Sequence, residues 1–301
     1  MQTAASCLDC FKLQIDYTTR LAASTPEKQA SIIAQASKLL AGVDPTISPP
    51  ENAVRIYRKI AELTGCIDPF ARLKKISNEL ALGMRPEISQ LIGSAQDPLY
   101  TALKLAIAGN VIDYGAHHDF EIERIVAESL AREPVINDYR QLRQDIAQAA
   151  SILYLGDNCG ELVFDGALIE QIGKEKKITL AVKENPIIND ALISDAIACG
   201  LDHLCEVISN GTDCPGTPLD HCNETFQEKF RQSDLIISKG QGNFETLSET
   251  KGPIYFLLTV KCKVVATHLA QLSNQPADTI NLGDLIIMKN RAPQRHFQQG
   301  G

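Results

Sequence analysis

The chain has 301 residues, of which 44% are hydrophobic and 22% are charged, so it can bury the core of one large domain or two ordinary ones. Its formal net charge of -8 argues against a general nucleic-acid partner or an acidic membrane partner, because both require a basic surface. Tryptophan is absent and aromatic residues make up only 5%, which argues against a platform for stacking nucleic-acid bases.

The start of the chain lacks the basic and apolar segments of a secretory signal. No apolar run approaches the roughly 18 residues that a membrane span requires. The cysteines are odd in number and scattered, which is unlike a disulfide framework. We therefore expect a cytoplasmic protein without a membrane partner, and the sequence leaves its oligomeric state open.

Residues 1–149 are predicted to form helices and no strand. Asp68-Pro69 has the pattern of an N-cap followed by proline, and apolar residues at helical spacing continue to Gly83. Asp97-Pro98 repeats this pattern, and the helix that follows is predicted to stop at Gly109. Further helices are predicted over 6–23, 26–41, 51–63, 118–131 and 135–149.

From about residue 150 the pattern changes to short apolar runs that are typical of strands. They lie at 151–155, 178–182, 204–208, 234–238, 254–258, 263–267 and 284–288. Helix-length segments separate the earlier runs, which predicts an α/β fold with a parallel sheet and right-handed crossovers. We therefore predict a helical domain over 1–149 and an α/β domain over 150–301.

Polar residues follow four consecutive predicted strands. They are Asp157 and Asn158 after the first strand, Asn185 to Asp190 after the second, Asn210, Gly211 and Asp213 after the third, and Lys239 to Asn243 after the fourth. Ligands of open α/β sheets bind beyond the carboxyl ends of the strands. Four polar loops in succession at that edge therefore predict a functional site.

Asp157, Asn158 and Asp190 are the candidate metal ligands, because carboxylate and amide oxygens suit Mg²⁺ or Mn²⁺ and leave positions for water and phosphate. A predicted helix begins at Glu161, so its unpaired N–H groups point at the same place. The alternative is that these residues cap the helices that follow them, and their spacing does not decide between the two roles.

Lys239 is the candidate phosphate-binding residue, because it lies in a glycine-rich loop directly after a predicted strand. Gly240 and Gly242 allow backbone amides to come close to a ligand. The alternative for Lys239 is a solvated surface side chain. Glu161 either orients a metal-bound water or simply favours the first turn of its helix, and Asn243 either contacts substrate or caps the next helix.

Two further motifs have less specific patterns. Asn110 and Asp113 follow the predicted end of a helix, where they either project towards a cleft between the domains or only terminate the helix. Cys7 and Cys10 form a single CxxC, whereas a structural zinc site usually needs a second pair. Ordinary thiols are therefore the favoured interpretation, and we assign no role to this CxxC.

The motifs together resemble the DUF89 family of ARMT1-like metal-dependent damage-control phosphatases, and most closely its archaeal and bacterial branch with an N-terminal CxxC. The matching segments follow the family's order over nearly the whole chain: CLDC at 7–10, DPFARLKKISN at 68–78, AIAGNVIDYG at 106–115, GDNCGELVFD at 156–165, KENPIINDA at 183–191, SNGTDCPGT at 209–217 and KGQGNFETL at 239–247.

This resemblance implies a helical domain and a Rossmann-like α/β domain, in which helices cover both faces of a mostly parallel sheet and the metal lies between the domains. The family's Asp-Asn pair falls on Asp157 and Asn158, its third metal ligand on Asp190, and its phosphate-binding lysine on Lys239. Family members hydrolyse phosphomonoesters, often of sugars or damaged metabolites, with Mg²⁺, Mn²⁺, Co²⁺ or Ni²⁺. The resemblance therefore implies a metal-dependent phosphatase that acts on a small phosphorylated metabolite.

In this interpretation the catalytic residues are Asp157, Lys239 and Glu161. The expected substrate-binding residues are Asn110, Asp113, Asn189, Asn210, Gly211, Lys239, Gly240 and Asn243. One alternative is a carboxyl methyltransferase that binds S-adenosylmethionine on the same sheet, for which Gly156 and Gly160 supply part of a glycine-rich turn. A non-catalytic module that binds a metabolite or a metal is the other.

Overall fold

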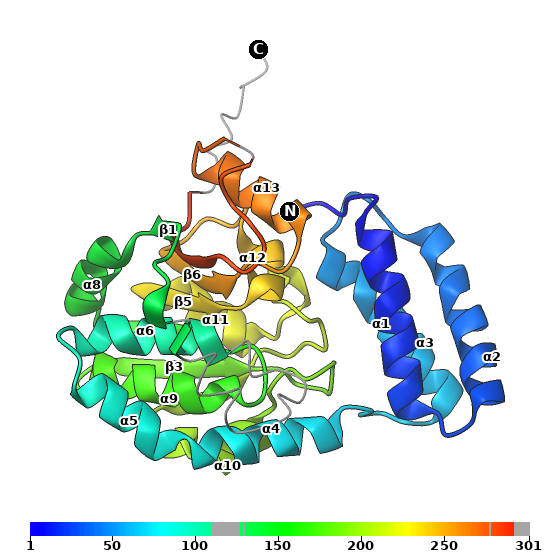
Figure 1. Cartoon of the computed structure of the whole chain (residues 1–301), viewed down its shortest axis with the longest axis horizontal. Helices are drawn as coiled ribbons and strands as arrows, with labels where there is room; N and C mark the ends of the chain where they lie inside the picture. The colour runs from blue at the N-terminus through cyan, green and yellow to red at the C-terminus, as the bar shows by residue number, and fades with distance from the viewer. Residues whose placement is uncertain (110–126, 129, 277, 292–301) are drawn as a thin grey trace.

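The computed structural model describes residues 1–109, 127–128, 130–276 and 278–291. Its centre is a seven-stranded sheet with the strand order β1-β7-β6-β5-β2-β3-β4 (Figure 1). The strands are β1 (Ile136–Asn137), β2 (Ser151–Leu155), β3 (Lys177–Val182), β4 (Glu206–Ser209), β5 (Leu235–Lys239), β6 (Ile254–Thr259) and β7 (Leu285–Lys289). Neighbouring strands are parallel except β6 and β7, which are antiparallel.

The central strands form because they are almost wholly apolar, as strands buried on both faces must be. In β2, Ile152 and Tyr154 pack into one hydrophobic core, whereas Leu153 and Leu155 pack into the other. This alternation follows from the two-residue period of a strand. The sheet therefore separates two cores, one on each face.

Helices cover both faces of the sheet. The buried residues of each core show which helices pack on which face. The first core takes side chains from α4 (Ala71–Gly83), α5 (Arg85–Gly93), α6 (Pro98–Ala108), α8 (Tyr139–Gln148), α9 (Glu161–Ile172) and α10 (Ile193–Ala198). The second takes side chains from α11 (Glu224–Gln232), α12 (Gln241–Leu247) and α13 (Lys263–Leu272). The predicted α/β class, with a mostly parallel sheet covered on both faces, is confirmed.

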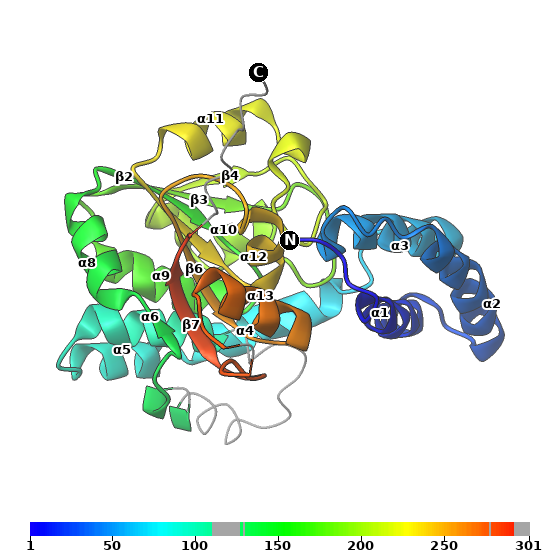
Figure 2. The same ribbon diagram turned by 90° about the horizontal axis from the view of Figure 1, so that it is seen from above.

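The first three helices form a separate bundle beside the sheet (Figures 1 and 2). They are α1 (Cys7–Ala22), α2 (Pro26–Ser37), which continues into a 3-10 turn (Lys38–Gly42), and α3 (Pro49–Thr64). Their own core contains Phe11, Ile15 and Ile56. Helix α3 starts at a capping box between Ser48 and Glu51, which satisfies backbone donors at its first turn. The helices before residue 109 are therefore divided between two cores, because α4 to α6 pack on the sheet.

Four sequence expectations about elements were wrong or incomplete. Asp68 does not cap α4, which begins at Ala71 with Phe70 at its N-cap position. Strand β1 lies before residue 150, inside the segment predicted as a helix over 135–149, and it pairs with β7 through the buried Ile136. The apolar run at 263–267 is the start of α13, in which Val265, Ala266 and Leu269 are buried at helical spacing. Helix α5 was not predicted. None of the helices in the described ranges has both the length and the apolar character that a bilayer crossing requires.

The order of strands also fixes where a ligand can bind. From β2 the chain moves outwards through β3 to β4 on one side, and then returns to place β5 on the other side of β2. The carboxyl ends of β2 and β5 are therefore the topological switch point of the sheet, where open α/β folds bind ligands. The loops that carry Asp157 and Gly240 begin at these two ends.

Candidate metal centre and active site

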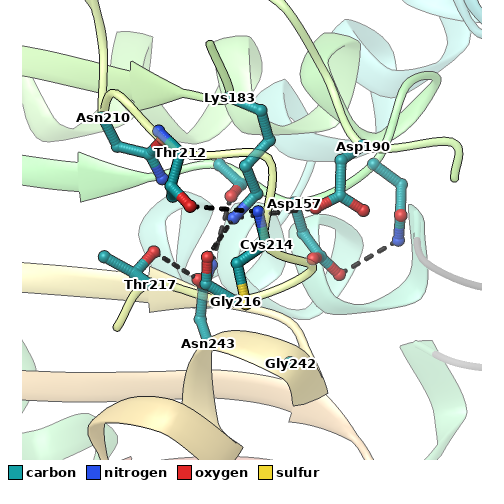
Figure 3. Close-up of polar contacts among 12 residues, drawn as sticks. Asp157, Lys183, Asp190, Asn210, Thr212, Cys214, Gly216, Thr217, Gly242 and Asn243 are labelled. Carbon is teal, nitrogen blue, oxygen red and sulfur yellow. Dashed lines mark hydrogen bonds and ion pairs between the residues drawn. The ribbon is translucent and has the colours of Figure 1, made fainter. Parts of the chain in front are cut away.

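Backbone pairing holds the loop after β2 against the loop after β3. Asn158 and Asp190 form an isolated antiparallel bridge. The N–H of Ala191 donates to the carbonyl oxygen of Asp157 at 2.9 Å. Figure 3 shows Asp157 and Asp190 approaching each other from these two loops. The structure therefore brings together the three side chains that the sequence identified as candidate metal ligands.

Two carboxylates fix the orientation of the Asn158 amide. Its Nδ2 donates to Asp157 Oδ2 at 3.0 Å and to Glu161 Oε1 at 2.7 Å. Because these two contacts use both amide hydrogens, the amide oxygen is the atom that remains to bind a cation.

The donor set of this site consists of oxygen atoms and is buried. Asp157, Asn158 and Asp190 expose 8%, 4% and 1% of their surface. Two carboxylates and an amide suit a hard divalent cation such as Mg²⁺ or Mn²⁺. Within the described ranges, no three His, Cys, Asp or Glu side chains are arranged to hold a metal ion, so the amide of Asn158 is needed to complete the set. The residues fit a cation that also binds water or substrate.

The balance of charge around these residues also favours a cation. The buried ionisable side chains of this cluster are Asp157, Glu161, Asp165 and Asp190 on one side and Lys183 and Lys239 on the other. Burial, followed by the charge of Glu161, raises the pKa of Asp157 to about 7, although nearby lysines act in the opposite direction. A divalent ion would balance the excess of carboxylates and favour their ionised forms.

Glycine residues after β5 allow the chain to pack tightly against the site. Gly240 has a φ of +79°, and a Cβ atom there would lie 1.9 Å from Asp157 Oδ2. A Cβ atom on Gly242 would lie 1.8 Å from the carbonyl oxygen of Pro215. These two glycines therefore make room for groups of the protein itself.

Lys239 ends β5. The sequence led us to expect its side chain in an open glycine-rich loop, but the side chain is buried inside the protein. Its Nζ donates to Asp165 Oδ1 at 2.7 Å and to Glu161 Oε2 at 3.0 Å, and 1% of its side chain is exposed. Burial by itself would lower the pKa of Lys239, but the charges of Asp165 and Glu161 outweigh it and raise the pKa above the usual lysine range. Its charge is therefore engaged by carboxylates of the protein.

Two other lysines lie at the same edge of the sheet and were missed in the sequence. Lys183 directly follows β3, where its Nζ donates to the carbonyl of Gly216 at 2.6 Å and lies 3.6 Å from Asp190 Oδ2. Lys261 precedes α13 and is exposed, and among the lysines it lowers the pKa of Asp157 most. A search for any lysine just after a predicted strand, whether or not glycines follow it, would have identified both residues.

The loop after β4 is held in shape by its own polar groups. Asn210 Oδ1 accepts a hydrogen bond from the N–H of Thr212 at 3.1 Å. Gly211 has a φ of +82°, and a Cβ atom there would lie 2.7 Å from Asn223. Asn210 and Gly211, both expected to bind substrate, therefore form a tight turn.

Asn243 also binds the protein through its side chain. Its Nδ2 donates to the carbonyl of Lys239 at 2.8 Å and to that of Gly156 at 3.2 Å, and its Oδ1 accepts from Thr217 Oγ1 at 2.7 Å. Asn243 thus joins the loop after β2, the end of β5 and the loop after β4.

Of the remaining substrate-binding candidates, the structure describes Asn189 but not Asn110 or Asp113. Asn189 is buried, and its carbonyl oxygen accepts from the N–H of Cys159 at 2.9 Å, beside the metal-ligand candidates. Asn110 and Asp113 lie outside the described residues. All nine cysteines are free thiols, and the structure adds no role for Cys7 and Cys10.

Asn78 of α4 supports the site from another element and was also missed. Its Oδ1 accepts from the N–H of Gly160 at 2.7 Å, and its Nδ2 donates to Asp195 Oδ1 at 3.1 Å. Gly160 is the N-cap of α9 and has no side chain to cap that helix itself. Asn78 therefore satisfies a backbone donor at the helix start that presents Glu161.

Fold and site together define an α/β protein with a buried cluster of oxygen donors at the switch point of its sheet. The family model described as "Damage-control phosphatase ARMT1-like domain" matches residues 3–275, so the chain belongs to this family. The predicted family is confirmed.

Two curated relatives carry functional names. A damage-control phosphatase of Pyrococcus horikoshii is 35% identical over 296 residues, which cover 97% of this chain and 99% of the relative. A damage-control phosphatase of Archaeoglobus fulgidus is 30% identical and covers 95% of this chain and 98% of the relative. The crystal structure of a DUF89 family protein from P. horikoshii matches 96% of this chain and 99% of that one, with a TM-score of 0.87 and 35% identity. The predicted phosphatase class agrees with the names of both relatives.

Proposed function

We propose that this protein is a divalent-metal-dependent phosphatase that hydrolyses a small phosphorylated metabolite. The observation that carries the proposal is the buried cluster at the ends of β2 and β3, in which carboxylates outnumber lysines and the donors are oxygen atoms. The names of the relatives from P. horikoshii and A. fulgidus supply the reaction class.

Asp157, Asn158 and Asp190 would hold the metal ion in this proposal. When bound, a divalent ion polarises a phosphoryl oxygen and lowers the pKa of a bound water. Mg²⁺ and Mn²⁺ are the ions that this donor set favours, with Co²⁺ and Ni²⁺ as further candidates. Glu161 holds the Asn158 amide in the orientation that presents its oxygen.

Lys261 is the residue that we assign to the phosphate group of the substrate. Its side chain is exposed at the site edge and its charge acts on Asp157, so it can approach an anion as a point charge. Lys183 reinforces the positive potential beside Asp190. Lys239 acts indirectly in this proposal, because its ammonium binds Glu161 and Asp165.

The methyltransferase alternative finds no support in the geometry. It requires an open glycine-rich turn after β2, where the cofactor would lie. The N–H of Gly160 is instead taken by Asn78, and a Cβ atom on Gly160 would lie 3.2 Å from Ser77. Packing from α4 therefore fills the turn.

The proposal is tested with the EDTA-treated protein and a panel of sugar phosphates and p-nitrophenyl phosphate, each assayed with Mg²⁺, Mn²⁺, Co²⁺ or Ni²⁺. We expect release of phosphate that requires an added ion and that is lost in Asp157→Asn and Asp190→Asn. Turnover of any of these esters that persists unchanged in EDTA would contradict the metal requirement.

The assignment of Lys261 has its own test. We expect Lys261→Ala to lower kcat/KM by about 100- to 1000-fold, the usual cost of losing one group that stabilises transition-state charge. Lys251→Ala is the matched control, because Lys251 is an exposed lysine at the opposite end of β6. Equal kcat/KM in the two variants would remove Lys261 from the site.

A further inference from the structure

A continuous series of buried polar contacts leads from the interior of the fold to the proposed metal ligands. The hydroxyl of Tyr154 donates to Asp165 Oδ1 at 2.6 Å, and Lys239 Nζ donates to the same oxygen at 2.7 Å. Lys239 Nζ also donates to Glu161 Oε2 at 3.0 Å, while Glu161 Oε1 accepts from Asn158 Nδ2 at 2.7 Å. None of the five side chains is more than 4% exposed.

The positions of these residues in their elements explain why they meet. Glu161 and Asp165 are four residues apart in α9 and so lie on one face of that helix. In the neighbouring strands, Tyr154 of β2 pairs with Ile237 of β5, and Lys239 follows Ile237 by two residues. Tyr154 and Lys239 therefore point to the same side of the sheet, towards α9.

A gain in stability does not explain why these charged groups are buried. Removing carboxylates and an ammonium group from water is costly, and a buried ion pair is often no better for stability than apolar residues of the same volume. The second oxygen of Asp165 is buried and has no hydrogen-bond partner among the described residues. An unsatisfied buried acceptor is itself unfavourable. The contacts that leave this group, however, end on the amide of Asn158.

We propose that Asp165, together with Tyr154, is a positioning residue for the metal centre. Asp165 shares the charge of Lys239, Lys239 holds the carboxylate of Glu161, and Glu161 fixes the Asn158 amide with its oxygen directed to the cation. Without Asp165, Lys239 would bind Glu161 alone and draw it away from Asn158. Groups that orient metal ligands in this way typically change metal affinity by 10- to 100-fold. The inference rests on the proposed function, because it requires that the site binds a metal.

The chain contains a matched control at the other end of the sheet. The hydroxyl of Tyr255 donates to Asp145 Oδ2 at 2.7 Å, and Lys289 Nζ donates to the same oxygen at 2.8 Å. This group repeats the tyrosine, aspartate and lysine of the first one, but no contact among the described residues joins it to Asn158. Substitutions there remove the same kinds of bond, although from a partly exposed group in which Lys289 and Asp145 are 34% and 29% exposed, and these bonds do not lead to the proposed metal ligands.

The experiment measures Mn²⁺ affinity by isothermal titration calorimetry and by the loss of the free-Mn²⁺ electron paramagnetic resonance signal. For Asp165→Asn we expect a Kd for Mn²⁺ that is about 10- to 100-fold weaker than that of the wild type, and a smaller weakening in the same direction for Tyr154→Phe. Asp145→Asn and Tyr255→Phe should keep the wild-type affinity. Thermal midpoints in EDTA show whether each variant is folded.

The outcomes separate this inference from the proposed function. If the wild type binds Mn²⁺ and Asp165→Asn binds it as tightly, the positioning role is overturned and the proposed function stands. The same holds if Asp145→Asn loses as much affinity as Asp165→Asn. If Asp165→Asn does not fold, Tyr154→Phe decides, and wild-type affinity in that variant overturns the role. A wild type that binds none of Mg²⁺, Mn²⁺, Co²⁺ and Ni²⁺ in the same titration removes the metal-dependent function and the inference together.

Discussion

At the scale of single residues, the close packing of Gly240 against Asp157 sets a steric limit on the proposed metal ligands themselves. No side chain fits at position 240, because the place of a Cβ atom is already occupied by the carboxylate. The positive φ adds a second restriction, since only glycine adopts this conformation without strain. This position therefore reports on the placement of Asp157 without removing a polar group.

We expect Gly240→Ala to abolish measurable Mn²⁺ binding and phosphatase activity, because Asp157 must move to admit the methyl group. Gly65→Ala is the control: Gly65 has a φ of +70°, but a Cβ atom there would meet nothing within 4 Å. That variant should lose about 1 kcal/mol of unfolding free energy and keep its affinity. Urea unfolding and Mn²⁺ titration measure both effects, and normal Mn²⁺ affinity in Gly240→Ala would contradict the steric argument.

Glu245 of α12 should make stability depend on pH. Burial raises the pKa of Glu245 from 4.5 to about 7, although a hydrogen bond from Gln241 acts in the opposite direction. The folded state therefore binds this proton more tightly than the unfolded state. Its contribution is fully present below pH 4.5 and is lost as the pH rises through about 7.

The unfolding free energy of the wild type relative to Glu245→Gln should accordingly fall by up to about 3 kcal/mol between pH 5 and pH 8. Urea unfolding in EDTA at several pH values measures the difference between the two proteins, in which other titrating groups cancel. A difference that stays constant, or that rises with pH, would show that Glu245 does not titrate in this way.

The gathering of Asp157, Asn158 and Asp190 could be predicted from the sequence, because successive parallel strands end at one edge of a sheet. The direction of Lys239 could not, because Glu161 and Asp165, which bind it, lie in α9, and the sequence alone does not show which face of that helix packs on β5. The metal-binding roles themselves stay predictions.

At the scale of elements, α4 and α9 are coupled through Asn78 and the N–H of Gly160. We expect Asn78→Ala to cost about 1–3 kcal/mol of unfolding free energy, because it leaves a buried N–H without its acceptor. It should also weaken Mn²⁺ binding, because Glu161 begins the same helix. Thr25→Ala removes the N-cap of α2 far from the sheet and should cost about 1 kcal/mol without changing Mn²⁺ affinity. Equal Mn²⁺ affinities in both variants would limit Asn78 to a structural role.

Elements were predicted well where the apolar residues formed a clear pattern and where capping or turn residues marked the ends. The Asp97 N-cap of α6 and the apolar run of β2 are examples, and both agree with the structure. The segment at 263–267 was predicted as a strand because a short run of valine and alanine fits either structure. Its helical state is decided by tertiary packing of Val265 and Leu269 against the sheet.

At the scale of the whole molecule, binding of a metal ion to the folded state alone should stabilise the chain by mass action. At a Mn²⁺ concentration about 100 times the Kd, we expect the unfolding free energy to rise by about 2.7 kcal/mol. Asp190→Asn should abolish this increase. Chemical unfolding with and without Mn²⁺ measures it, and an equal increase in the wild type and in Asp190→Asn would place the bound ion elsewhere.

The place of β5 between β2 and β6 has a consequence for synthesis on the ribosome. Strand β2 can pair with β3, and β3 with β4, as soon as these segments emerge, because all three are made in sequence. The other edge of β2 then stays bare until residues 235–239 leave the exit tunnel and insert beside it. A nascent chain stalled before that point would display an apolar strand edge, which is a natural target for chaperones and for self-association.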